Sequence, residues 1–228
     1  MSDNTSSDPH SWEHKMREPL SFFTLCISEN NPQKYYDRYK FEKSKISLQG
    51  APASGIDGSL MAFMETSQLK LVSNLKAVTT GLYDEINCLK KKPMTASEMH
   101  KKFGEMQEDT KKKSDKHIND CFEEAQKHLY EEEKRLDKEK KPLEKDPKHL
   151  EEDPESDLWT EIVRVWEEGI GMVLAAWAKT WDWICQAAKD VADFFVGVWE
   201  SVKNAMIKAV EWIEEAAQNV KDFFKSLF

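Results

Sequence analysis

The sequence lacks a hydrophobic run long enough to cross a membrane. In its C-terminal segment the longest stretch without a charged residue is Gly169–Ala178, ten residues, whereas a transmembrane helix needs about 20 apolar residues. Met1 to Pro9 is polar and acidic, so it shows no signal-peptide pattern. We therefore expect a cytoplasmic protein that associates peripherally with membranes, in the plane of the surface rather than across it.

Cysteine is scarce and widely spaced. No two of the four cysteines form a Cys-x-x-Cys pair: they are Cys26, Cys88, Cys121 and Cys185. This spacing excludes the usual zinc-cluster and dithiol motifs. Because no export signal precedes them, we expect reduced thiols rather than disulfide bonds.

Motifs of enzyme chemistry are also missing. No Gly-x-Ser-x-Gly motif occurs, and Gly169-Ile-Gly171 lacks the remaining residues of a phosphate-binding loop. His10 and His14 have a spacing that can share a metal ion on a helix, but no third ligand accompanies them. We predict a protein that is not an enzyme and that uses no metal or cofactor.

Positive charge is in deficit. The net charge is −9, and no basic stripe interleaved with aromatic residues occurs, so the sequence does not indicate nucleic-acid binding. Charged residues make up 33% of the chain and hydrophobic residues 39%. This balance is typical of a water-soluble, helix-rich protein.

Proline and tryptophan divide the chain. All eight prolines lie at or before Pro154, and seven of the eight tryptophans follow it. We predict an irregular N-terminal module, its first 15 or so residues disordered, then a helical hairpin, a charged hinge and a long amphipathic helix. Their ranges are 1–57, 58–141, 142–153 and 154–228. The fold class is mainly all-α.

The N-terminal module has the weakest pattern. Leu20–Ile27 is rich in apolar and aromatic residues and is consistent with a strand. Tyr35–Phe41 is aromatic and basic, and fits a short helix or a strand. The pattern gives no physical reason for this aromatic cluster.

The hairpin prediction depends on periodicity and capping. Apolar residues recur every three or four positions over 58–92. Thr95 and Glu98 form a capping box at the start of a second helix, which extends to about residue 141. The short link between the helices favours an antiparallel pair, and the dense charge of the second helix indicates a solvated face.

The segment 154–228 has the strongest pattern, one amphipathic helix whose apolar residues stay in phase. As a single helix it would be ~110 Å long. All charged residues from Glu161 to Lys225 lie outside the apolar stripe. The residues chosen from this apolar stripe as the binding face are Trp159, Trp166, Ile170, Trp177, Trp181, Phe195, Trp199, Ile213 and Phe224. The helix either stays extended or folds back on the hairpin as a helical bundle, with a bend at Gly169–Gly171 or at Gly197.

The repeat of the apolar stripe indicates the kind of surface that covers it. Trp166, Trp177 and Trp199 are separated by 11 and 22 residues, whereas a coiled coil repeats every seven. This spacing resembles the pattern of exchangeable apolipoproteins and other droplet-coating helices. The resemblance is one of pattern, and it implies a soluble helical bundle that opens on lipid.

Two functions from different classes follow. The first is reversible binding to a lipid or membrane surface through the apolar stripe, with pore formation as a variant. Residues 157–228 hold 12 acidic and 7 basic residues, so we expect apolar insertion rather than attraction to anionic headgroups. The alternative is a non-enzymatic interaction or scaffold protein, whose apolar stripe is covered by its own hairpin, by partner helices or by self-association as a homo-oligomer.

Overall fold

The computed structural model describes residues 12–40, 56–89, 94–140, 154–192 and 198–227. For residues 136–140, 154–157, 188–192 and 198–201 it describes the backbone only. The described residues form six helices and no strand, which confirms the predicted all-α class. The helices are α1 Trp12–Ser28, α2 Pro32–Tyr39, α4 Gly58–Leu89, α5 Ala96–Lys140, α6 Pro154–Ala192 and α7 Val198–Ser226.

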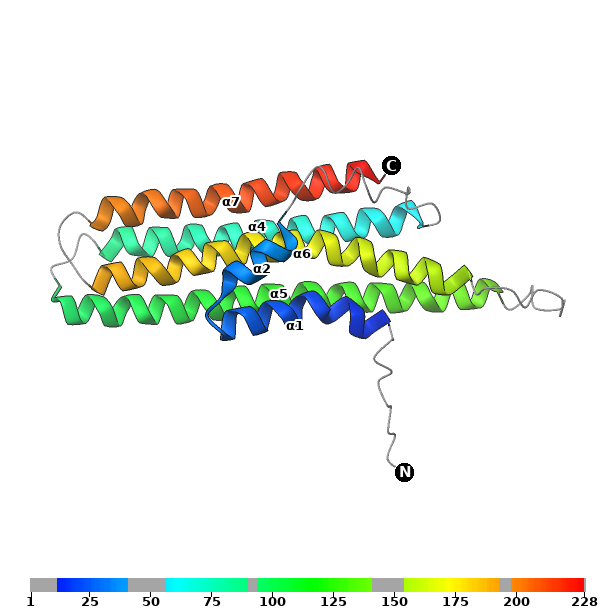
Figure 1. Ribbon diagram of the computed structural model, residues 1–228, viewed down its shortest axis with the longest axis horizontal. Helices are drawn as coiled ribbons and strands as arrows, with labels where there is room; N and C mark the ends of the chain where they lie inside the picture. Colours follow the sequence, from blue (N-terminus) through cyan, green and yellow to red (C-terminus); the bar gives the residue numbers. More distant parts are fainter. Residues whose placement is uncertain (1–11, 41–55, 90–93, 141–153, 193–197, 228) are drawn as a thin grey trace, which may run out of the picture.

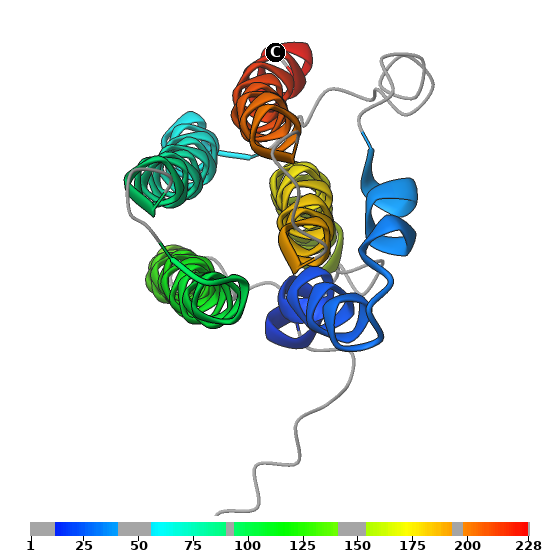
Figure 2. The ribbon, with the colours of Figure 1, turned by 90° about the vertical axis from the view of Figure 1, so that its left-hand side faces the viewer.

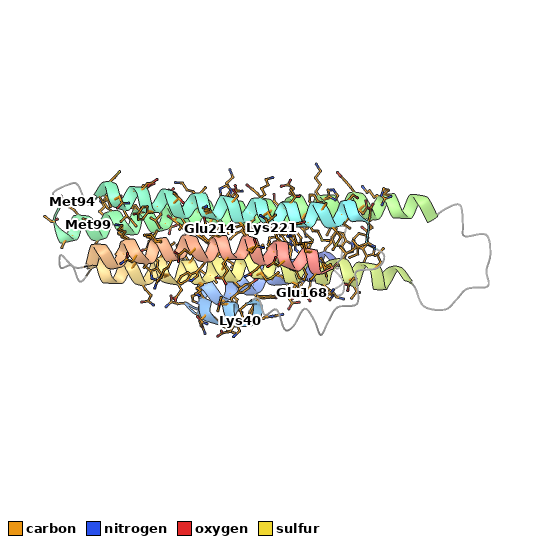
Figure 3. The ribbon with its side chains drawn as sticks, turned by 90° about the horizontal axis from the view of Figure 1, so that it is seen from above. Lys40, Met94, Met99, Glu168, Glu214 and Lys221 are labelled. Atoms are coloured by element: carbon orange, nitrogen blue, oxygen red, sulfur yellow. The ribbon has the colours of Figure 1, made fainter. Side chains whose placement is uncertain are left out.

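The predicted hairpin is confirmed. Helices α4 and α5 pack side by side and run in opposite directions (Figure 1). The capping box is present: the Glu98 N–H donates to Thr95 Oγ1 at 3.3 Å, and the Thr95 N–H donates to Glu98 Oε2 at 2.9 Å. Met94 and Met99 lie at this end of the bundle (Figure 3).

The charges of α5 face solvent, as expected. Lys113 pairs with Asp109 at 2.6 Å and Lys111 with Asp115 at 3.5 Å, each one helical turn away. All four side chains of these pairs are about half exposed. Such pairs add little stability, so this face keeps the helix soluble while its other side packs against α4.

Helix α6 is the centre of the molecule. Figure 2 shows α4, α5, α7, α1 and α2 arranged around it, and α6 is the helix that packs against all five. Its segment Gly169–Ala178 can be enclosed in this way because it carries no charge on any side. Of these ten residues, nine are buried and Ala176 is partly buried.

The prediction of one straight helix over 154–228 is wrong, and the folded-back arrangement is confirmed. Helices α6 and α7 lie antiparallel against each other (Figure 1), so each buries its apolar side in the same core. The helix continues through Gly169 and Gly171 without interruption. The reversal falls between Ala192 and Val198, and Gly197 lies outside the described residues.

The prediction of a strand at Leu20–Ile27 is wrong, because α1 contains this segment. The buried residues of α1 recur three or four apart, which is the period of a helix: Met16, Pro19, Phe23 and Cys26. The expected initial disorder is also wrong for Trp12 to Lys15, which belong to α1.

Of the aromatic segment Tyr35–Phe41, for which a short helix or a strand was expected, residues 35–39 are helical and belong to α2, and Phe41 lies outside the described residues. Asn31 caps α2 by accepting a hydrogen bond from the Lys34 N–H, and Pro32 occupies the first turn. The charged hinge at 142–153 lies outside the described residues.

Candidate lipid- or partner-binding surface

The central members of the predicted binding face are inside the bundle. Trp166 and Ile170 are 0% exposed and Trp177 is 2% exposed. Trp166 packs edge-on against Phe122 of α5, with ring centroids 5.6 Å apart. The ring centroid of Trp177 is 6.3 Å from that of Trp181. The described members of the apolar stripe are therefore covered by the chain's own helices.

Trp159 of α6 and Trp12 of α1 together connect three helices. The Trp159 ring stacks on that of Trp12, with centroids 5.4 Å apart and planes 18° from parallel. Trp12 Nε1 donates to Glu133 Oε1 of α5 at 3.0 Å. The sequence pattern did not predict the contact between Trp12 and Trp159, because Trp12 lies far along the chain from the other tryptophans.

The remaining predicted residues divide into two groups. Ile213 and Phe224 of α7 are buried, and Trp181 of α6 is partly buried. Trp199 belongs to α7, and only its backbone is described. Phe195 lies outside the described residues. The structure thus brings the described members together in one core rather than along an exposed face.

Two glycines let neighbouring helices approach α6 closely. A Cβ atom at Gly169 would lie 2.2 Å from Gln68 Oε1 of α4, and one at Gly171 would lie 2.3 Å from the Tyr39 ring of α2. Residues two apart in a helix point to nearly opposite sides, so the two glycines admit two different neighbours. The sequence indicated a possible bend here, whereas the structure uses both glycines for packing.

Several buried polar atoms around α6 have no hydrogen-bond partner among the described residues. They include both amide atoms of Gln68, Nε1 of Trp166 and the hydroxyl of Tyr35. Each of these side chains is 0% exposed. A buried polar group without a partner costs about 1–3 kcal/mol, so the closed core holds α6 with less stability than a fully apolar core would.

Charged side chains near the start of α6 form ion pairs with one another. Arg164 donates to Glu161 and to Glu168 at 2.8 and 2.7 Å. The hydrogen bond from Arg164 lowers the pKa of Glu161. These side chains are about one third exposed, so they mark the outer edge of the buried region.

Helix α2 is attached to α6 by its tyrosine rings and by polar groups. The Tyr39 hydroxyl donates to Glu167 Oε1 at 2.9 Å. Arg38 contacts Glu18 of α1 at 2.9 Å and the same Glu167 at 3.6 Å. Burial, followed by the nearby Glu167 carboxylate, raises the pKa of Tyr39 well above its usual value.

A small groove lies between α2, α6 and α7. Its volume is about 60 Å³, and Tyr36, Met172, Lys179 and Trp212 are among its lining residues. The Lys179 ammonium lies 4.9 Å from the Tyr36 ring centroid and 4.2 Å from that of Trp212. The lysine thus occupies this aromatic site itself.

Comparison with other proteins gives no family for this chain. No protein-family model matches it, and no curated protein or solved structure shows significant similarity to it. Within the described residues no helix is long and apolar enough to cross a bilayer. In the same residues no group of three or more metal-ligating side chains occurs.

Proposed function

We propose that this protein is a closed helical bundle that binds lipid surfaces reversibly by opening and presenting α6. The observation that carries the proposal is the enclosure of Gly169–Ala178, an uncharged segment flanked by tryptophans, by all five other helices. Helix α6 as a whole is amphipathic, with charged residues on either side of this segment, and such a helix can replace apolar contacts within the protein by apolar contacts with lipid. The closed bundle would then be the conformation of the protein in water without lipid.

The unpaired polar atoms around α6 support opening. Gln68 and Trp166 give up hydrogen bonds to water in the closed state and gain none among the described residues. In an opened bundle these groups regain water or headgroup partners. The closed form is therefore destabilised at the surface that opening would expose.

The charge of the segment favours neutral lipid. Residues 157–228 hold 12 acidic and 7 basic residues, so attraction to anionic headgroups is weak. Binding would depend on inserting the apolar stripe among acyl chains, where tryptophan rings prefer the interfacial depth.

One observation favours the second function, a helical interaction or scaffold protein. The described members of the apolar stripe are already covered by the chain's own helices, as a protein that never meets lipid requires. In that function the outer surface of the bundle would bind the partner. The experiment below separates the two functions.

The test mixes the purified chain with neutral phosphatidylcholine vesicles whose acyl chains carry bromine. Lipid binding predicts that the protein floats with the vesicles and that bromine quenches its tryptophan emission, because the rings reach the acyl region. A protein that neither floats nor is quenched is not a lipid binder, and the scaffold function then stands. Leakage of a dye from the same vesicles would support pore formation in addition to lipid binding.

The decisive variant is Gln68→Met. It removes two unpaired buried atoms while keeping an unbranched chain of similar length, so it should stabilise the closed bundle by about 1–3 kcal/mol and reduce flotation. Gln186→Met places the same change at an exposed position of α6 and is the control. Unchanged flotation in a stabilised Gln68→Met protein would contradict binding by opening. Charged substitutions at Trp166 or Trp177 are unsuitable, because both side chains are buried.

A further inference from the structure

Helix α2 is a small outer layer on one side of α6. It packs extensively against two of the described helices, α6 and α1, and it lies at the edge of the bundle in Figure 2. Seen from above, Lys40 at its end lies on the opposite side of α6 and α7 from the α4–α5 hairpin (Figure 3).

The surface beneath α2 is the small-residue side of α6. The Tyr39 ring lies against Gly171, where a Cβ atom would approach it to 2.3 Å. Met172 and Ala175 line the adjoining groove beside Tyr36. This side lies opposite the apolar stripe on the helical wheel, so α2 supplies the cover that makes α6 buried all round.

The attachment of α2 combines ring packing with polar contacts, and one of its buried polar groups has no partner among the described residues. The helix sequence, Pro-Gln-Lys-Tyr-Tyr-Asp-Arg-Tyr, contains no leucine, isoleucine, valine or methionine, and its buried residues are Pro32 and Tyr35. Its contacts are phenol rings, the Tyr39–Glu167 hydrogen bond and the ion pairs of Arg38. Tyr35 is fully buried, yet its hydroxyl has no partner among the described residues.

We propose that α2 is a releasable, autoinhibitory cover, and that its departure from α6 is the first step of bundle opening. The proposal deepens the proposed lipid function and rests on it. It also accounts for the aromatic cluster at residues 35–39. Phenols cover an apolar surface while keeping a polar group that water can solvate after release.

The chain carries its own probes of release. Cys26 of α1 is 0% exposed and its carbonyl accepts the Asn31 N–H at the α1–α2 junction. Cys121 lies between α4 and α5, with Sγ 3.7 Å from the Ser67 carbonyl oxygen. Cys88 is exposed. Alkylation of Cys26 therefore reports loosening at α2, alkylation of Cys121 reports opening of the hairpin, and Cys88 is the internal standard.

The experiment uses Gly171→Ala in the full-length chain. The new methyl group would meet the Tyr39 ring and displace α2, so we expect Cys26 alkylation without lipid to rise about tenfold, as an overpacked contact implies. Cys121 alkylation should stay unchanged. Flotation with phosphatidylcholine vesicles should rise several-fold. Gly104→Ala, whose Cβ would meet nothing within 4 Å, is the matched control. Tyr39→Phe, which removes only the bond to Glu167, should give a smaller change in the same direction.

The outcomes separate the two proposals. If the unmodified chain floats and the Gly171→Ala chain floats no better despite faster Cys26 alkylation, the cover is not inhibitory and the inference is overturned. Unchanged Cys26 alkylation in both variants also overturns it. If no chain floats although Cys26 alkylation rises, the lipid function fails, and the inhibitory role fails with it.

Discussion

At the scale of single residues, burial determines how reactive a cysteine thiol of this protein is. Cys121 and Cys88 are the same residue on the two helices of the hairpin, yet Cys121 is 6% exposed and Cys88 is exposed. Burial raises the pKa of the Cys121 thiol from 9.0 to about 12. The Cys121 side chain therefore behaves as an apolar core group, not as a nucleophile.

The raised pKa of Cys121 predicts an alkaline loss of stability. The unfolded thiol ionises near pH 9, whereas the folded one stays protonated to about pH 12. Its contribution is therefore fully present below pH 9 and is lost as the pH rises from 9 to 12, by up to about 4 kcal/mol. Denaturant titrations should show a shallower alkaline decline for Cys121→Ala than for the unmodified chain. Equal declines would contradict this prediction.

A second residue-scale prediction concerns acid. The Arg164 hydrogen bond lowers the pKa of Glu161, so its contribution is present above the unfolded pKa and is lost as the pH falls through the lowered folded value. Because the pair is about one third exposed, we expect the effect to be about 1 kcal/mol or less. Glu161→Gln should show a flatter stability profile below pH 4.5 than the unmodified chain.

At the scale of elements, side-chain size sets the distance between helices. Gln68 reaches α6 because Gly169 leaves room for its amide, and Tyr39 reaches the same helix at Gly171. Glycine weakens a helix by roughly 0.5–1 kcal/mol relative to alanine. The two glycines of α6 exchange this helical stability for close contact with α4 and α2.

A double-mutant cycle tests the α4–α6 contact. Gly169→Ala should cost about 1 kcal/mol or less, because the crowded Gln68 amide is the end of a flexible side chain that can shift. In a Gln68→Ala background the added methyl group has space, so its cost should fall by more than half. Denaturant unfolding measures both. Additive effects of the two substitutions would show that the contact does not set this helix spacing.

At the scale of the whole molecule, the sequence predicted elements better than assembly. The period of the apolar residues located α4 and α5 and showed that 154–228 is helical, but not that it divides into α6 and α7, and Thr95 with Glu98 located the cap of α5. Periodicity does not name the partner of a stripe, so an extended tail and a folded-back tail looked alike. The feature of the sequence that indicated burial on every face of the helix was the absence of charged residues within Gly169–Ala178.

The sequence pattern failed to predict the N-terminal helices for a different reason. Leu20–Ile27 is rich in residues that also suit strands, and its helical period becomes visible only when Met16 is included. The role of the aromatic residues of α2 depends on Gly171 and Glu167. These contacts join residues more than 120 positions apart, which no local pattern reveals.

The tryptophans give a prediction for the whole bundle. Trp166→Glu or Trp177→Glu would place an unpaired charge in the core and should abolish cooperative unfolding. Trp212→Glu, at a partly buried position beside Lys179, should leave the helical content intact. Circular dichroism and size-exclusion chromatography measure the difference. A folded Trp166→Glu protein would show that the core is not closed around α6.

The central place of α6 also dictates an order of assembly during synthesis. Tyr39 and its partner Glu167 are 128 residues apart, so α1 and α2 emerge from the ribosome long before the helix that receives them. At ordinary translation speeds the delay is about 6–25 s. The α4–α5 hairpin, whose contacts are close in sequence, can form during that interval. Helices α1 and α2 must wait for α6, and a chaperone that recognises aromatic segments would meet them in that time.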